Sequence, residues 1–279
     1  MAADSGLAYT QGSDAILKNP AGIVRSRARE FSWVQSKLFE TVDYQAVGFT
    51  GFLTDTVALG LGVIHSRVDG IEETTHSGTF TGRTIDYSDS QLMVGLAFHF
   101  KMVDDLIGST VFDHLYGGFT YKYVMSRMHT YHAIGSGLDI GFQIRLPHNQ
   151  WFGLTFVNVI QPNMLWNTPV ATETQSAPYT KLGWVFEFVP NVMIAFDLFK
   201  DTITQEDRYS IGLDYSIIHL HTISMNLKAG YKDDRYTVGV GLGLGGIDFH
   251  YAMEQEHASY MNATHWMGVT LSFQAVDTP

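Results

Sequence analysis

The chain contains no cysteine in its 279 residues. Neither a disulfide framework nor a thiolate metal site is therefore available. Basic residues are also scarce, because 17 Lys and Arg stand against 28 Asp and Glu and leave a formal charge of −11. Since nucleic-acid binding relies on clustered basic residues, we expect no nucleic-acid partner.

Long hydrophobic runs are missing too, although hydrophobic residues make up 45% of the chain and aromatic residues 13%. The most apolar window, Gly183–Phe199, is interrupted by Glu187, Pro190 and Asp197. A membrane-spanning helix needs about 18 or more consecutive apolar residues, so the sequence predicts no such helix. The apolar residues instead alternate with polar ones, and this alternation indicates β-strands.

The alternation continues from Glu30 almost to the end of the sequence and predicts about fourteen strands. The expected strands are Glu30–Phe39, Val42–Leu53, Val57–Val68, Ser90–Phe100, His114–Met125, His132–Leu146, Gln150–Ile160, Thr180–Val189, Val192–Phe199, Arg208–Ile217, Thr222–Tyr231, Arg235–Leu244, Ile247–Met253 and Thr264–Phe273.

The connections between these strands are of two lengths. Most connections after even-numbered strands are tight turns, such as Pro190–Asn191 and Gly245–Gly246. The two longest, Asp69–Asp89 and Gln161–Ala177, are polar loops that follow odd-numbered strands. Short turns at one end and long loops at the other are typical of outer-membrane β-barrels. The connection Lys101–Asp113 departs from this rule and is interpreted as irregular or briefly helical.

The two faces of each expected strand differ in chemistry. On Thr180–Val189, for example, Leu182, Trp184 and Phe186 share one face. The opposite faces of the strands carry mainly Gly, Ser, Thr and isolated charges. A soluble β-sandwich also alternates, but its exterior is usually dense in Lys and Glu. An apolar exterior around a polar, glycine-rich interior favours an all-β transmembrane antiparallel barrel over a sandwich.

The stretch Gly12–Val24 carries little strand signal. Pro20 has no N–H group for a sheet, and Gly22 can adopt a positive φ. Such a short peptide has no core of its own, so we expect it to fold into the lumen of the barrel as a hatch. A disordered N-terminus is the alternative. The expected organisation is an N-terminal hatch segment over residues 1–29, a barrel over 30–274 and a tail over 275–279.

Several short motifs are similar to those of a known family. Asn19-Pro-Ala-Gly22, which follows Gly12-Ser-Asp-Ala15, resembles the N-terminal hatch of the FadL superfamily of fourteen-stranded outer-membrane barrels. The motif pattern further along the chain is closer to the PorV/PorQ-type branch. It consists of Gly137-Leu-Asp-Ile-Gly141 followed by Trp151-Phe-Gly-Leu-Thr-Phe-Val-Asn158. Further short motifs continue the resemblance as far as Thr270-Leu-Ser-Phe273, so that it covers nearly the whole chain.

The resemblance implies an N-terminus that plugs the lumen from the periplasm. For FadL-like members it implies passive movement of fatty-acid-like or aromatic hydrophobic molecules, whereas PorV-like members resemble anchors or shuttles for an exported protein. The expected location is the bacterial outer membrane, with outer-membrane lipid around the barrel. Because Met1–Gly6 lacks the features of a secretion signal, we expect the sequence to be a mature form. No cofactor is expected.

Two groups of residues are candidates for function. The hatch and ligand-binding candidates are Ala15, Ile16, Leu17, Asn19, Pro20, Ile23 and Val24. The expected lumen charges are Lys122, Asp139, Arg145, Glu187, Asp197, Asp214, Lys228 and Asp248. These charges could form a polar pathway or anchor the hatch, but cross-strand pairing that compensates buried charge is the favoured interpretation.

Catalysis and metal binding are not expected. A nucleophile with a base and an orienting group would be needed for a hydrolase, and no spacing in the sequence matches one. His219 and His221 lie in an expected turn without a third ligand nearby, which argues against a metal site. The tryptophans Trp33, Trp151, Trp184 and Trp266 are interpreted as residues of an interfacial girdle.

Overall fold

The structure is a computed structural model that describes residues 5–26, 28–101, 114–169, 172–204, 207–220, 222–255 and 263–274. Short helical turns come first: η2 (Gly12–Asp14), α1 (Ala15–Lys18) and η3 (Pro20–Val24). The strands that follow are β1 (Ala28–Leu38), β2 (Val42–Thr54), β3 (Val57–Thr74), β4 (Phe80–His99), β5 (His114–Met128), β6 (Tyr131–Leu146), β7 (Gln150–Ile160), β8 (Asn163–Trp166), β9 (Thr172–Gln175), β10 (Tyr179–Val189), β11 (Val192–Asp201), β12 (Asp207–His219), β13 (Ile223–Lys232), β14 (Arg235–Leu244), β15 (Ile247–Glu254) and β16 (Thr264–Gln274).

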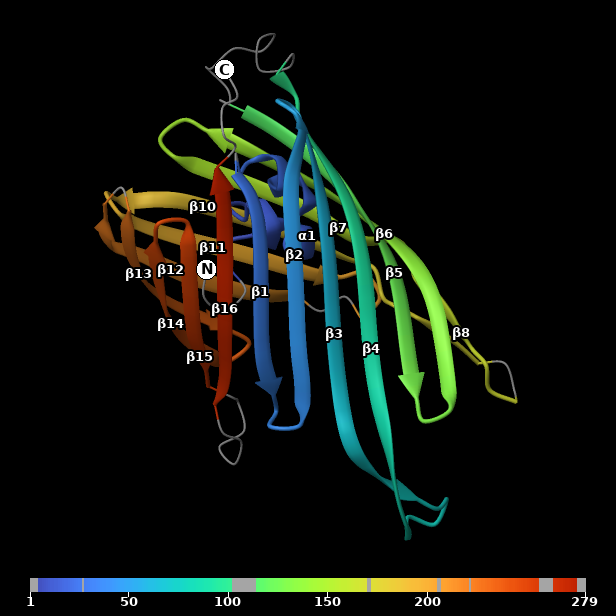
Figure 1. The fold of residues 1–279 in the computed structure, drawn as a ribbon. Helices are drawn as coiled ribbons and strands as arrows, with labels where there is room; N and C mark the ends of the chain where they lie inside the picture. The colour runs from blue at the N-terminus through green and yellow to red at the C-terminus, as the bar shows by residue number, and fades with distance from the viewer. Residues whose placement is uncertain are drawn as a thin grey trace.

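The strands form one antiparallel sheet that closes into a barrel (Figure 1). The first strand, β1, pairs with the last, β16, and the ring is completed where β5 pairs with β6. Of the sixteen strands, β8 and β9 form a short pair attached to β6, which leaves fourteen in the barrel. The expected strand number is confirmed, and the closed ring rules out the sandwich alternative.

Side chains alternate between the outside and the lumen along most of each strand, apart from bulges such as the one at Ser216–Ile218. On β10, Trp184 is 36% exposed on the outer surface, whereas Val185 faces inward and is fully buried. The large exposed hydrophobic residues of β3, β4, β12 and β15 follow the same outward pattern. The exterior of the barrel is therefore apolar along most of its strands, as the alternation predicts.

The polar stretch Asp69–Asp89 is not a long loop. Instead, β3 and β4 continue through most of it as a paired hairpin that projects beyond the neighbouring strands (Figure 1). Ile71, Thr74 and Ile85 have β-branched side chains that suit strands. Both faces of this hairpin are exposed, and most of their side chains are polar. The prediction was wrong because it required apolar alternation.

The stretch Gln161–Ala177 also contains strands. β8 continues the pairing with β6 that β7 begins, and β9 pairs with β8. Pro162 interrupts the long strand between β7 and β8, since it has no N–H group to donate. The expected loop is therefore an extension of the β7–β10 hairpin within the described residues.

The turns Leu53–Thr56, Pro147–Asn149, Pro190–Asn191 and Gly245–Gly246 lie at the end of the barrel where β1 begins, whereas Phe39–Thr41, His129–Thr130 and Asp233–Asp234 are short turns at the opposite end. Asn191 and Gly245 take left-handed conformations in two of them, with φ of 69° and 58°. In the connection Lys101–Asp113 only Lys101 is described, so the expected short helix lies outside the described residues, as does the tail 275–279. No helix in the described part of the chain is long and apolar enough to cross a membrane.

Candidate functional site

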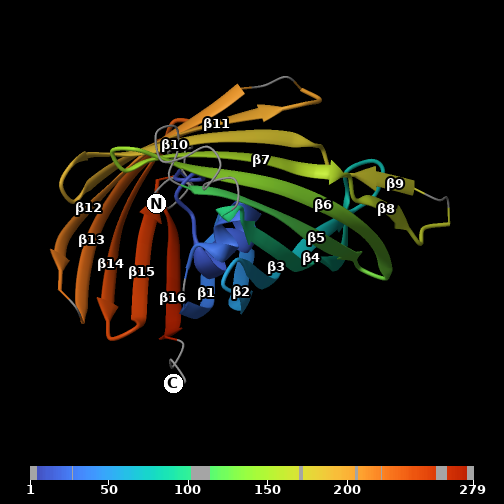
Figure 2. The same cartoon turned by 90° about the horizontal axis from the view of Figure 1, so that it is seen from above.

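Residues 5–26, here called the N-terminal segment, lie inside the barrel (Figure 2). Their fold follows from the Asn19–Pro20 step, because the residue before a proline is driven out of the α region. Asn19 is accordingly extended, at φ −147° and ψ 105°, and separates α1 from η3. Its side-chain oxygen accepts a hydrogen bond from the N–H of Ala21 at 3.1 Å and caps η3. The segment is thus a compact pair of helical turns.

Apolar side chains of the N-terminal segment pack directly on the backbone of the wall. Ile16 and Ile23 are 2% and 1% exposed. A Cβ atom at Gly95 would lie 2.7 Å from Cδ1 of Ile16 and 2.8 Å from Cδ1 of Ile23. At Gly60 it would lie 2.9 Å from each of the same two atoms. Only glycine leaves room for these two side chains.

Glycines that touch the segment form a continuous path around one side of the lumen. They occur as cross-strand neighbours on β2–β7 and β10, in the pairs Gly48 with Gly62, Gly60 with Gly95, Gly118 with Gly141, and Gly153 with Gly183. We call these eight residues the glycine track. Each would bring an added Cβ close to atoms of the N-terminal segment, as Gly118 would to Pro20 and Gly153 to Ala8.

Hydrogen bonds to wall side chains fix the position of the segment. Gln143 of β6 donates through Nε2 to the carbonyl oxygens of Leu7 at 3.0 Å and Thr10 at 2.9 Å. Asp197 of β11 accepts from the N–H of Leu7 at 3.0 Å. Asn19 donates to the carbonyl of Phe142 at 3.1 Å. These bonds satisfy backbone groups that would otherwise be buried without partners.

Arg25 joins the end of the segment to its beginning. Its Nη1 donates to Oε1 of Gln143 at 3.0 Å and to the carbonyl of Ala8 at 3.3 Å. The guanidinium carbon lies 3.5 Å from the ring centre of Trp151, in cation–π geometry. Burial lowers the pKa of Arg25 to about 10. The group therefore remains protonated at neutral pH.

Two cavities border the N-terminal segment. The larger, of about 820 Å³, lies between the segment and the inner faces of β5–β7 and β10–β13, at the end of the barrel where β1 begins. The smaller, of about 210 Å³, separates the segment from Asp214 of β12 and Lys228 of β13. Tyr9, Gln11 and Asp214 line both cavities.

Four of the expected lumen charges form cross-strand ion pairs. Lys122 and Asp139 form an ion pair of 2.7 Å between β5 and β6. Asn158, at a bulge in β7, accepts from Lys122 at 2.6 Å, and its N–H donates to Asp139 at 2.7 Å. Lys228 and Asp214 are 3.9 Å apart. This arrangement matches cross-strand compensation, the interpretation that the sequence favours.

The remaining expected charges have other neighbours. Arg145 and Glu187 both bind the side chain of Asn149, at 3.3 Å and 2.6 Å. Asp197 accepts a hydrogen bond from the N-terminal segment. Asp248 is half-buried on β15.

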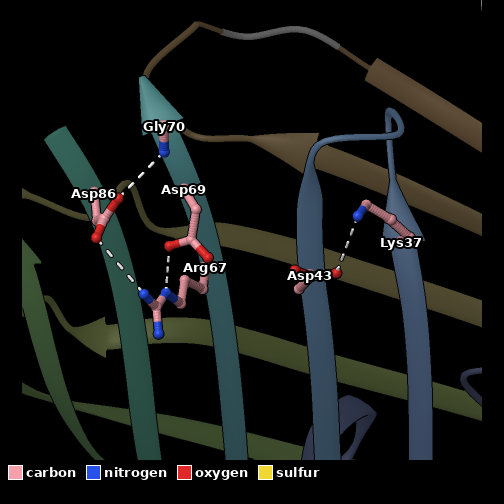
Figure 3. A network of polar contacts seen from close by, with 6 residues as sticks. All are labelled: Lys37, Asp43, Arg67, Asp69, Gly70 and Asp86. Atoms are coloured by element: carbon pink, nitrogen blue, oxygen red, sulfur yellow. Dashed lines mark hydrogen bonds and ion pairs between the residues drawn. The ribbon is translucent and has the colours of Figure 1, made fainter. Parts of the chain in front are cut away.

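A further polar network lies on the outer surface of the barrel, away from the segment (Figure 3). Arg67 bonds Asp69 and lies 3.6 Å from Asp86, which also accepts from the N–H of Gly70. Lys37 pairs with Asp43 at 3.7 Å on the neighbouring strands. Three carboxylates and two cations take part, and their ion pairs join β1 to β2 and β3 to β4 near the ends of these strands.

Comparison with known proteins identifies the fold. No protein-family model and no curated protein sequence matches the chain. The crystal structure of the Pseudomonas putida toluene transporter TodX matches 97% of this chain and 96% of its own, with a TM-score of 0.64 at 10% identity. A Pseudomonas aeruginosa FadL homologue matches 96% of this chain and 94% of its own, with a TM-score of 0.55 at 10% identity. The chain has a FadL-like fold.

The expected resemblance to the FadL superfamily is confirmed at the level of the fold, whereas the PorV/PorQ-type branch stays a prediction. In this FadL-like barrel the girdle assignment was wrong for two tryptophans. Trp151 shares the inward face of Gly153 and contacts Arg25, and Trp266 shares that of Gly268. The described part of the chain holds no group of three or more His, Asp or Glu residues that could bind a metal ion. His221 lies outside the described residues.

The sequence alone did not reveal the wall residues that contact the N-terminal segment. Gln143 appeared only as one polar residue on the inward face of its strand, and its contacts depend on residues more than 130 positions away. The glycine track does have a sequence signal, because glycines recur at inward positions of successive strands. That signal indicates a close approach of another backbone and does not say which segment approaches.

Proposed function

We propose that the chain is an outer-membrane barrel through which hydrophobic small molecules pass without chemical change, and that the N-terminal segment is its hatch. The apolar exterior fits lipid, and the end opposite the long β3–β4 hairpin fits the periplasmic side of such a barrel. The observation that carries the proposal is the packing of Ile16 and Ile23 on the glycine track inside a FadL-like barrel.

The proposed class of ligand is fatty-acid-like or aromatic. The toluene transporter and the FadL homologue share the fold, which supports a hydrophobic class without identifying the molecule. Mid-height lumen residues are mostly small or polar, and the apolar groups available inside the barrel belong chiefly to the N-terminal segment and its contacts. Ala15, Ile16, Ile23 and Val24 pack with Met93 in one buried cluster.

The ligand would occupy the place of these side chains when the segment shifts, because they fill that space themselves in the present conformation. Burying about 300 Å² of apolar ligand surface there contributes roughly 7 kcal/mol before association costs, which corresponds to micromolar binding at best. Such a shift would break the hydrogen bonds of the segment to Gln143 and Asp197, whereas its apolar contacts with the glycine track involve no side chain of those glycines.

Replacement of both Ile16 and Leu17 by Asp tests the proposed ligand site. Two carboxylates in the apolar contact should abolish saturable binding of a fluorescent fatty acid to the detergent-solubilised barrel. Gln11→Asp is the matched control, because Gln11 lies on the same segment but is exposed to a cavity. This variant should bind like the unaltered chain, and both should remain folded, as judged by a gel mobility that changes on boiling.

The outcomes separate the two functions implied by the family resemblance. Loss of binding in the Ile16 and Leu17 variant alone supports the proposal. If the unaltered chain binds neither fatty acids nor aromatic compounds saturably, the transport proposal fails. A barrel that anchors or shuttles an exported protein then takes its place.

A further inference from the structure

The N-terminal segment has two chemically different sides. Gln11, Asp14 and Lys18 are spaced by three and four residues, which places them on one side of the helical turns. Gln11 and Asp14 are exposed although they lie inside the barrel. Ile16, on another side, is buried against the glycine track. The segment therefore seals one side of the lumen and presents a polar surface to the other.

The inner wall of the barrel opposite this polar surface is separated from it by a cavity. The 210 Å³ cavity lies between Gln11, Asp14 and Lys18 on one side and Asp214 and Lys228 on the other. Because it shares Tyr9, Gln11 and Asp214 with the 820 Å³ cavity, the two spaces adjoin. On β14, the inward Gly241 has His250 and Asn226 as its nearest neighbours rather than the segment.

We propose that this space is a polar passage along β12 and β13, through which small inorganic ions and other small hydrophilic solutes cross the barrel with the N-terminal segment in place. The passage is separate from the proposed route for hydrophobic molecules and uses the opposite side of the segment. It requires only that the barrel spans a membrane.

The charges of the passage suit hydrated ions of either sign. Asp14 and Asp214 supply two carboxylates, and Lys18 and Lys228 supply two ammonium groups, so neither sign is strongly repelled. Lys228 and Asp214 are 3.9 Å apart, beyond the length of a direct hydrogen bond. We place the narrowest point of the passage at this pair, because both residues line the smaller cavity.

The absence of cysteine allows a direct test of the passage. Lys228→Cys places a single thiol in the passage, and Met93→Cys places one on the sealed side, where Met93 is 3% exposed and close to the segment. Each full-length variant is inserted in a planar bilayer in potassium chloride. A charged, membrane-impermeant methanethiosulfonate is then added to one side or the other.

The unaltered chain should conduct, and the reagent should reduce the current of Lys228→Cys from either side. Met93→Cys should stay unmodified until residues 4–24 are deleted, and this deletion also demonstrates that the thiol is intact and the barrel inserted. Three results would overturn the passage: no conductance of the full-length chain, modification of Lys228→Cys from one side only, or equal modification of the two cysteines. None of these readouts depends on a hydrophobic ligand, so they leave the proposed function to its own test.

Discussion

Gly95 illustrates how a missing side chain determines what the lumen can hold. Its inward surface is occupied by the Cδ1 atoms of Ile16 and Ile23. Gly95→Val would overpack this contact at a cost of about 1–3 kcal/mol, enough to raise the population of a displaced segment about 5- to 150-fold. We expect trypsin to cleave after Lys18 correspondingly faster in the detergent-solubilised variant, as measured by mass spectrometry.

Gly51→Val is the matched control for this prediction, because a Cβ at Gly51 would have no neighbour closer than 3.7 Å. Cleavage after Lys18 should be unchanged in that variant. Equal cleavage rates in the two variants would contradict the close packing of the segment on the glycine track.

Trp151 shows which properties of a single residue could be predicted from the sequence and which could not. Its strand alternates Trp151, Gly153 and Thr155 with Phe152, Leu154 and Phe156. The face with glycine and threonine is the inner one, so the alternation alone places Trp151 in the lumen. The girdle interpretation relied on residue type instead. The contact with Arg25 was beyond prediction, because 126 positions separate the two residues and only the closed barrel brings them together.

At the scale of elements, the strands were predictable wherever their two faces differ. The expected Gln150–Ile160 and Arg235–Leu244 coincide with β7 and β14, and most other boundaries differ by a few residues. The outer parts of β3 and β4 were missed because both of their faces are polar. The helical turns of the N-terminal segment were also beyond prediction, since α1 has only four residues and depends on tertiary contacts.

The bulge of β7 depends on a network that joins three strands through Lys122, Asp139 and Asn158. Lys122→Met leaves the buried carboxylate of Asp139 without its cation, which costs about 3–5 kcal/mol. We expect the folded, fast-migrating form on a gel to be lost at a lower temperature. Adding Asp139→Asn removes the unpaired charge and should restore part of the loss. A single variant that resists heat like the unaltered chain would show that the pair does not hold these strands.

At the scale of the whole molecule, the N-terminal segment lies off-centre in the lumen of the barrel. The N-terminal segment lies on the glycine track of β2–β7 and β10, while polar cavities separate it from β12 and β13. The alternation of the sequence was sufficient to predict a fourteen-stranded barrel, because apolar and polar faces recur on every strand. The off-centre position of the segment was not predictable, since it depends on which inward glycines become cross-strand neighbours in the sheet.

The central claim is that the N-terminal segment occludes the lumen, and single-channel conductance of a variant without residues 4–24 tests it most directly. In a planar bilayer the shortened barrel should still insert, and its conductance should be severalfold larger than that of the full-length chain, because the space held by Ile16, Ile23 and their neighbours becomes water. Conductance equal to that of the full-length chain would contradict the account and place the segment outside the conducting lumen.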